Sequence, residues 1–150
     1  MSTMRKLLSS VLSRQRFAVL ATEGDGAPYT NLVAYACNSE LDALVFLTPR
    51  ETKKFSNIIG NPQVSLFVDN ISNQPEDIQS AVGISIAGIA SVIDDDLKGK
   101  YLKNYLERHP YLEDFAWADG NALIRVEVEQ YTVVSNFSRV EEFDPRSPNS

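Results

Sequence analysis

Apolar residues alternate with polar or small residues in several short stretches of the chain, a spacing typical of β-strands that bury one face. The strands expected from this pattern, and from one short apolar run, cover residues 17–22, 29–37, 44–47, 64–69, 83–93, 124–129 and 131–137. Turn residues such as those at 23–26 separate the first three strands and predict an antiparallel meander. Gly88, in the middle of the longest strand, predicts a β-bulge or a close approach of two backbones.

Two segments near the ends of this strand pattern have the spacing of helices. Residues 3–13 carry Leu at 7, 8 and 12 and Val at 11, all on one helical face. Residues 94–108 begin with three aspartates, which favour a helix start, and end shortly before Pro110. Both segments are therefore expected to be helices that pack one side against the sheet.

A third helix is expected between the strands at 44–47 and 64–69. Thr48 can cap it, Pro49 suits the first helical position, and Glu51 completes a capping box. Gly60, followed by Asn and Pro, ends it. The sequence thus predicts a helix that starts at Thr48.

These elements together predict an α+β, mainly β fold. Seven strands with short helices at the ends and in one strand connection favour a barrel-like sheet of antiparallel strands in a single domain, residues 1–143. A length of 150 residues suits one domain rather than two. Residues 144–150 are polar and contain two prolines, so we expect a disordered tail there.

Charge and cysteine content narrow the range of partners and compartments. The net charge is −6, so no overall basic field attracts nucleic acid or an anionic membrane, and any anion site must be local. One cysteine, Cys37, excludes an internal disulfide and fits a reducing compartment. No apolar run approaches the roughly 20 residues that span a bilayer, and the N-terminus lacks the features of a signal peptide. We therefore expect a cytoplasmic protein.

The strongest candidate for a binding site is a cluster of basic residues at the start of the third helix. A helix N-terminus already carries partial positive charge and unpaired N–H groups. Arg50, Lys53 and Lys54 add three cations there, an arrangement that an anion would stabilise. A phosphate could be bound by these side chains together with the hydroxyls of Thr48 and Thr52. The alternative is an ordinary surface helix with solvated lysines and arginine.

The sequence offers no other obvious chemistry. A single histidine, His109, and a single cysteine are too few for a zinc site of the usual kind and do not indicate a Cys/His nucleophile pair. His109 precedes a proline at a helix end and is expected to be structural, and Cys37 is expected to be a small buried residue. We expect no metal site and assign no catalytic side chain.

Several loose motifs appear in an order that resembles the FMN-binding split barrels of the pyridoxamine 5′-phosphate oxidase-like family. In the first half they are residues 17–22 (FAVLAT), 26–29 (GAPY), the strand ending at Cys37, 47–48 (LT), 53–54 (KK) and 61–66 (NPQVSL). In the second half, residues 86–90 (IAGIA), 105–110 (YLERHP) and 134–139 (VSNFSR) resemble the haem-utilisation branch of that family. The resemblance covers about residues 14 to 140.

This resemblance implies a homodimer with FMN at the interface between the two subunits, acting on a small-molecule substrate or electron donor. It implies that the isoalloxazine ring lies along one strand and that a basic pair binds the phosphate, while Arg139 could approach the flavin of either subunit. The cofactor-binding residues expected on these grounds are Asn31, Leu32, Val33, Ala34, Tyr35, Leu47, Thr48, Arg50, Thr52, Lys53, Lys54 and Arg139.

The chain also departs from the family pattern. Pyridoxamine phosphate oxidases bind the substrate phosphate with a Tyr, Arg and Ser set, where this chain has Tyr105, His109 and Glu113. A glutamate there repels a phosphate, which argues against vitamin B6 oxidation. With His109 as the single histidine, conventional haem ligation is also disfavoured. Three hypotheses follow: an FMN-dependent oxidoreductase, a non-catalytic flavin- or haem-binding protein, and a split barrel that has lost its cofactor.

Overall fold

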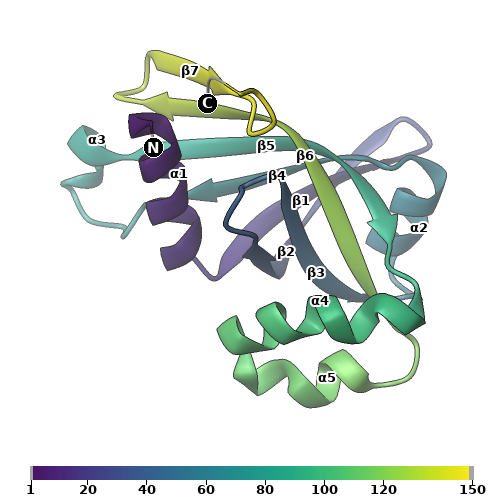
Figure 1. Ribbon diagram of the computed structural model, residues 1–150. Helices are drawn as coiled ribbons and strands as arrows, with labels where there is room; N and C mark the ends of the chain where they lie inside the picture. The colour runs from purple at the N-terminus through teal and green to yellow at the C-terminus, as the bar shows by residue number, and fades with distance from the viewer. Residues whose placement is uncertain (1, 149–150) are drawn as a thin grey trace.

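The computed structural model describes residues 2–148 and shows a closed antiparallel β-barrel (Figure 1). Seven strands form one sheet in the order β3-β2-β1-β4-β5-β6-β7. The sheet closes where β3 pairs with β6, so six strands form the barrel and β7 extends it from β6. The strands are β1 (Phe17–Gly24), β2 (Ala27–Cys37), β3 (Ala43–Pro49), β4 (Gln63–Asp69), β5 (Val82–Val92), β6 (Asn121–Ser135) and β7 (Arg139–Phe143). This architecture confirms the predicted mainly β, antiparallel barrel.

Short helices join or flank the strands. They are α1 (Thr3–Arg14), α2 (Lys53–Gly60), α3 (Asp77–Ser80), α4 (Asp95–Arg108), the 3₁₀ turn η1 (Pro110–Leu112) and α5 (Glu113–Trp117). α2 connects β3 to β4, and α4, η1 and α5 connect β5 to β6. Among the described residues, no helix is long and apolar enough to cross a bilayer.

The barrel interior is filled by side chains. Leu20, Tyr35, Phe46, Ile86 and Tyr131 come from five different strands, and each is fully buried. Leu8, Val11 and Leu12 of α1 pack on the same core, as does Ile58 of α2. In Figure 1, α1 and α2 lie at opposite ends of the barrel. The lumen is therefore a packed core that leaves no room for a ligand.

A second apolar cluster covers part of the barrel's outer wall. Val45 and Leu47 of β3 and Leu123 of β6 pack there against Leu102 and Tyr105 of α4. α4 and α5 lie together below the barrel in Figure 1. On this side, β3 is buried on both faces, which explains why its residues form an uninterrupted apolar run rather than an alternating one.

The last two strands differ from the sequence prediction. The strands expected at 124–129 and 131–137 are one strand, β6, and the true final strand is β7. Val128 pairs with Gly88 while Gln130 pairs with Ala87, so Glu129 is an extra residue in a bulge. The buried residues of β6 change there from even to odd positions. In the sequence, this change of phase looks like the boundary between two strands. The predicted irregularity at Gly88 is confirmed, because a β-carbon there would lie 2.5 Å from the carbonyl oxygen of Glu127.

The predicted start of α2 is also wrong. Thr48 and Pro49 are the last residues of β3, and Thr52 is the N-cap, accepting a hydrogen bond from the Phe55 N–H (3.3 Å). Tertiary pairing of β3 with β6 takes precedence over the local capping signal at Thr48, because Thr48 pairs with Ala122 in the ladder.

The segment predicted as a disordered tail lies partly within the described residues. Residues 144–148 form turns near α1, where the Arg5 Nη2 group donates to the Pro145 carbonyl (3.2 Å). Residues 149–150 lie outside the described part of the chain.

Candidate functional site

The turn between β3 and α2 arranges the predicted phosphate-binding residues in two groups. The hydroxyls of Thr48 and Thr52 lie 2.9 Å apart, and both contact the Pro49 carbonyl. They stabilise the turn from within, and Thr48 is fully buried. The basic side chains of Lys53 and Lys54 project from the first turn of α2 that this arrangement positions.

Lys53 and Lys54 have no carboxylate partner. None of the ion pairs formed by residues 2–148 includes either lysine. The Lys53 ammonium lies 4.9 Å from the centre of the Tyr29 ring on β2, which brings it to the start of the predicted flavin strand. Lys54 is half-buried, and this burial lowers the pKa of its ammonium. A bound anion would favour the charged form and offset this effect of burial, so the pair suits a phosphate.

The predicted flavin strand continues from Tyr29 along β2. Val33 and Tyr35 face the packed core, whereas Leu32 is 64% exposed on the outer wall. The side-chain oxygen Asn31 Oδ1 is buried and accepts no hydrogen bond. Asn31 pairs with the fully buried Leu20, so its side chain lies on the core-facing side of β2 with Val33 and Tyr35, not on the outer wall with Leu32.

Three other predicted site residues lie elsewhere. The Leu47 side chain is buried in the outer cluster with Leu102 and Tyr105 of α4. The Arg50 guanidinium turns toward α4, where it lies 4.0 Å from Asp95. Arg139 forms an ion pair with Glu141 (2.8 Å) and pairs with Ser135, at the end of β6 opposite to the Asn121–Pro49 pairing. The structure therefore brings Lys53 close to β2 and leaves Arg139 at the far end of the same subunit.

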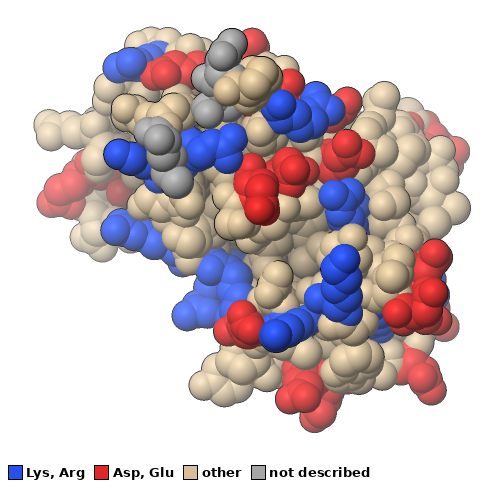
Figure 2. Space-filling view, in the orientation of Figure 1, with Lys and Arg blue, Asp and Glu red and all other residues tan. Residues whose placement is uncertain are grey.

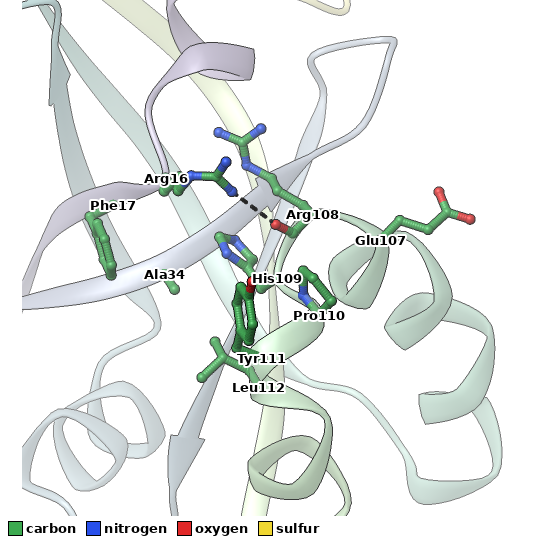
Figure 3. A pocket seen from close by; sticks show the side chains of 9 residues that line it. All are labelled: Arg16, Phe17, Ala34, Glu107, Arg108, His109, Pro110, Tyr111 and Leu112. Atoms are coloured by element: carbon green, nitrogen blue, oxygen red, sulfur yellow. Dashed lines mark hydrogen bonds between the residues drawn. The ribbon is translucent and has the colours of Figure 1, made fainter.

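A cavity of about 580 Å³ opens beside the same strand (Figure 3). Ala34 of β2 lies between Phe17 on one side and Tyr111 on the other, with the Arg16 guanidinium above. The remaining lining residues are Glu107, Arg108, His109, Pro110 and Leu112. This volume is within the range of roughly 300–1,000 Å³ that small-molecule sites occupy. No local pattern in the sequence predicts this cavity, because three separate segments meet to form it.

Tyr105 and His109, which align with substrate-binding residues in the family pattern, hold β2 in place instead. The Tyr105 hydroxyl donates to the Ala34 carbonyl (3.1 Å), and His109 Nε2 lies 2.7 Å from the Tyr35 carbonyl oxygen. Both side chains are buried, and burial lowers the pKa of the His109 imidazole. Since a carbonyl only accepts, Nε2 carries the proton. The predicted structural role of His109 agrees with these contacts.

A basic group and a cavity lie along one stretch of β2. Between Tyr29 and Ala34, β2 spans about 17 Å, with the unpaired lysines at one end and the cavity at the other. Within residues 2–148, no group of three or more His, Cys, Asp or Glu side chains could bind a metal ion. Figure 2 shows acidic and basic side chains interspersed on one face of the molecule, without a large basic field.

Residues 4–135 match the family model described as pyridoxamine 5′-phosphate oxidase. No curated protein sequence matches the chain. A haem-binding protein from Mycobacterium smegmatis has a similar structure (TM-score 0.83, 14% identity), in which 97% of this chain and 59% of that protein are covered. An FAD-binding protein from Mesorhizobium loti is similar (TM-score 0.68, 22% identity, 89% and 94% covered). So is HutZ, a haem storage protein from Vibrio cholerae (TM-score 0.68, 15% identity, 87% and 92% covered). At these identities the structural similarities establish the fold, and this chain spans about three fifths of the Mycobacterium protein.

Proposed function

Since the chain belongs to the pyridoxamine 5′-phosphate oxidase family, we propose that it binds FMN and acts as an oxidoreductase on a small molecule. The observation that carries this proposal is a pair of lysines at the start of α2, Lys53 and Lys54, that form no ion pair within residues 2–148. Lys53 contacts Tyr29 near the start of β2. The similar FAD-binding protein from Mesorhizobium loti supports a flavin in this fold.

The cofactor would lie between two copies of the chain. Because side chains fill the barrel, a ligand must bind on its outer wall, where one face stays open to water unless a second chain covers it. The outer wall of β2, β1 and β4 is apolar: Val19 pairs with Leu32 on one side and Phe67 on the other, and each is at least 40% exposed. Phe17 extends this surface to the cavity. An exposed apolar face of this kind favours a homodimer, in which Arg139 would reach the partner's flavin rather than its own.

A bound flavin would supply the redox chemistry, and the protein would position the reactants. The cavity between Phe17 and Tyr111 is the best place for a substrate, because Ala34 belongs both to its floor and to the flavin strand. Its aromatic walls, Phe17 and Tyr111, are exposed to water (55% and 98%), so a second chain would have to cover them, and Arg16 offers a cation at one end. Tyr105 and His109 donate to β2 and are unavailable to a substrate phosphate, which argues against a phosphate ester as substrate. The single cysteine fits a cytoplasmic location for this activity.

Flavin binding tests the proposal directly. Protein purified without added cofactor should show the two absorbance bands of oxidised flavin, or acquire them with FMN. The variant Lys53→Ala/Lys54→Ala should bind FMN at least roughly 100-fold more weakly, since each charge-assisted contact contributes about 1.5–3 kcal/mol. Riboflavin, which lacks the phosphate, should bind almost unchanged. The exposed pair Lys100→Ala/Lys103→Ala on α4 is the matched control. Equal weakening of FMN and riboflavin would refute the phosphate assignment.

The dimer has its own test. Leu32→Glu places a charge in the proposed interface and should convert the dimer to a monomer in light scattering coupled to size exclusion. Ile59→Glu is the control, because Ile59 is equally exposed (62%, against 64% for Leu32) but lies on α2. A wild-type monomer, or a Leu32→Glu dimer, would contradict the proposed interface.

A non-catalytic haem-binding protein is the second candidate, supported by the similar haem-binding proteins. The structure does not favour iron ligation by histidine, because His109 is buried and hydrogen-bonded to the Tyr35 carbonyl. Adding haem and FMN separately to the same preparation distinguishes the two candidates. The first predicts a flavin spectrum and the second a Soret band that His109→Ala abolishes.

A further inference from the structure

A second, smaller cavity lies between the β3–α2 turn and the α4–α5 pair. Its volume is about 260 Å³, and Arg50, Lys98, Trp117, Asp119 and Asn121 are among the residues that line it. The Arg50 N–H donates to the Gly120 carbonyl (2.9 Å), which ties the turn to the floor of this cavity. It therefore adjoins the segment that carries Lys53 and Lys54 but shares no lining residue with the cavity at Ala34.

Its cations, Arg50 and Lys98, lack a close carboxylate partner within residues 2–148, although Asp95 and Asp119 also line the cavity. Lys98 is only 8% exposed, and its ammonium donates to one neutral acceptor, the Asn121 carbonyl (3.1 Å). No ion pair within residues 2–148 includes Lys98. Arg50 has a long contact of 4.0 Å with Asp95, whose side chain is 87% exposed. A buried ammonium without a counter-ion is costly, so an anionic group in this cavity would stabilise the site.

The rim of the cavity offers contacts for a ring and a sugar. The Trp117 indole is 55% exposed and lies against α4, where a β-carbon at Gly99 would be 3.9 Å from its Cη2 atom. Its open face can stack on a base, an interaction worth about 1–3 kcal/mol. Asp119 provides a carboxylate of the kind that binds ribose hydroxyls in dinucleotide sites.

The size of the cavity indicates part of a ligand rather than a whole one, because it is smaller than the roughly 300–1,000 Å³ of complete small-molecule sites. We propose that it binds the adenosine phosphate half of a dinucleotide, with phosphate at Arg50 and Lys98 and adenine on Trp117. This inference rests on the proposed flavin site, because Arg50 belongs to the same basic segment as Lys53 and Lys54. The same group could belong to FAD in place of FMN, or to a nicotinamide dinucleotide that reduces bound FMN.

Titrations of the flavin-free protein with 5′-AMP, FMN and FAD test this assignment. We expect 5′-AMP to bind the wild type, and Lys98→Met and Trp117→Ala to weaken 5′-AMP about tenfold, which corresponds to about 1.4 kcal/mol. FMN binding should stay unchanged in both variants. Lys103→Met, an exposed lysine on the same helix, is the matched control. Because Lys98 is buried, circular dichroism should confirm that its variant folds, and the half-exposed Trp117 gives an independent result.

The outcomes distinguish FAD from a nicotinamide dinucleotide as the ligand, and they test this inference separately from the proposed flavin site. FAD binding that is tighter than FMN binding, and is weakened by both variants, identifies the flavin dinucleotide. If FAD gains nothing over FMN but 5′-AMP competes with NADPH on the FMN-loaded protein, the nicotinamide dinucleotide is the source. No 5′-AMP binding, or equal weakening of FMN and 5′-AMP by Lys98→Met, would overturn the inference. Failure of FMN to bind, with 5′-AMP binding intact, would instead overturn the proposed flavin site.

Discussion

Replacing Tyr131 with phenylalanine should destabilise the barrel more than the same change at Tyr35, although both rings are fully buried. The Tyr131 hydroxyl donates to the Leu41 carbonyl (2.6 Å), which accepts no other hydrogen bond described for residues 2–148. Leu41 has a φ of 64°, a left-handed conformation that costs a non-glycine residue roughly 1–2 kcal/mol. The hydroxyl thus holds a strained turn.

The Tyr35 hydroxyl donates to a carbonyl that has a second donor. Leu12 O accepts from Tyr35 (2.9 Å) and also from Arg108 Nη2 (3.2 Å), so it stays paired after Tyr35→Phe. We expect a loss of about 0.5–1.5 kcal/mol for Tyr35→Phe, the net value of one hydrogen bond. For Tyr131→Phe we expect about 1–3 kcal/mol, because the buried Leu41 carbonyl is left unsatisfied.

Urea unfolding followed by circular dichroism measures both losses, provided that the two variants and the wild type have the same m-value. The cofactor content must be matched, because a bound ligand adds to the apparent stability. A Tyr35→Phe variant that loses as much stability as Tyr131→Phe would refute the reasoning, since it would mean that Arg108 does not compensate at Leu12.

Three further predictions concern Gly88, Cys37 and His109. Gly88→Ala should lower the free energy of unfolding by about 1–3 kcal/mol, because its β-carbon would clash with the Glu127 carbonyl. Gly60→Ala is the control and should not destabilise the protein, because the space around Gly60 is open. Equal melting temperatures of the two variants would contradict this prediction. Burial raises the pKa of the Cys37 thiol to about 11, so its alkylation by iodoacetamide should still accelerate between pH 9 and 10, and a plateau near pH 9 would count against it. Burial lowers the pKa of His109, so as the pH falls below about 6.5 the unfolded chain takes up a proton that the folded chain resists, and stability should decrease. His109→Gln should flatten that part of the stability profile, and an unchanged slope would assign it to other groups.

Local patterns predicted most of the strands but not every boundary. Residues 64–69 alternate cleanly because one face of β4 packs in the barrel. The alternation in β6 changes phase at Glu129, and only the pairing with β5 shows that the strand continues. The hydrophobic pattern did not predict β7, because only Phe143 of its five residues is buried. Such a strand depends on its neighbour rather than on its own hydrophobic pattern.

The candidate site was predictable where it is local. Lys53 and Lys54 are adjacent in the sequence, and a helix start makes their charge conspicuous. The Arg50 side chain instead points toward Asp95 of α4, and α4 is too distant in sequence for a local pattern to predict this contact. Lys98 gave no signal at all, since a lysine in a polar helix is normally solvated, and its burial results from the packing of α4 beside Asn121.

The pairing of β3 with β6 also determines the order in which the molecule can form. Ala43 to Pro49 are made in the first third of the chain, whereas their partners, Asn121 to Glu127, are made near its end. During synthesis on the ribosome, β3 therefore has an unpaired edge until β6 emerges, and such an edge invites pairing with other chains. Closing so long a loop is slow compared with forming hairpins such as β1–β2. We therefore expect the hairpins to assemble first and the closure of the ring to be the late, rate-limiting event, the step at which a nascent copy is most exposed to aggregation.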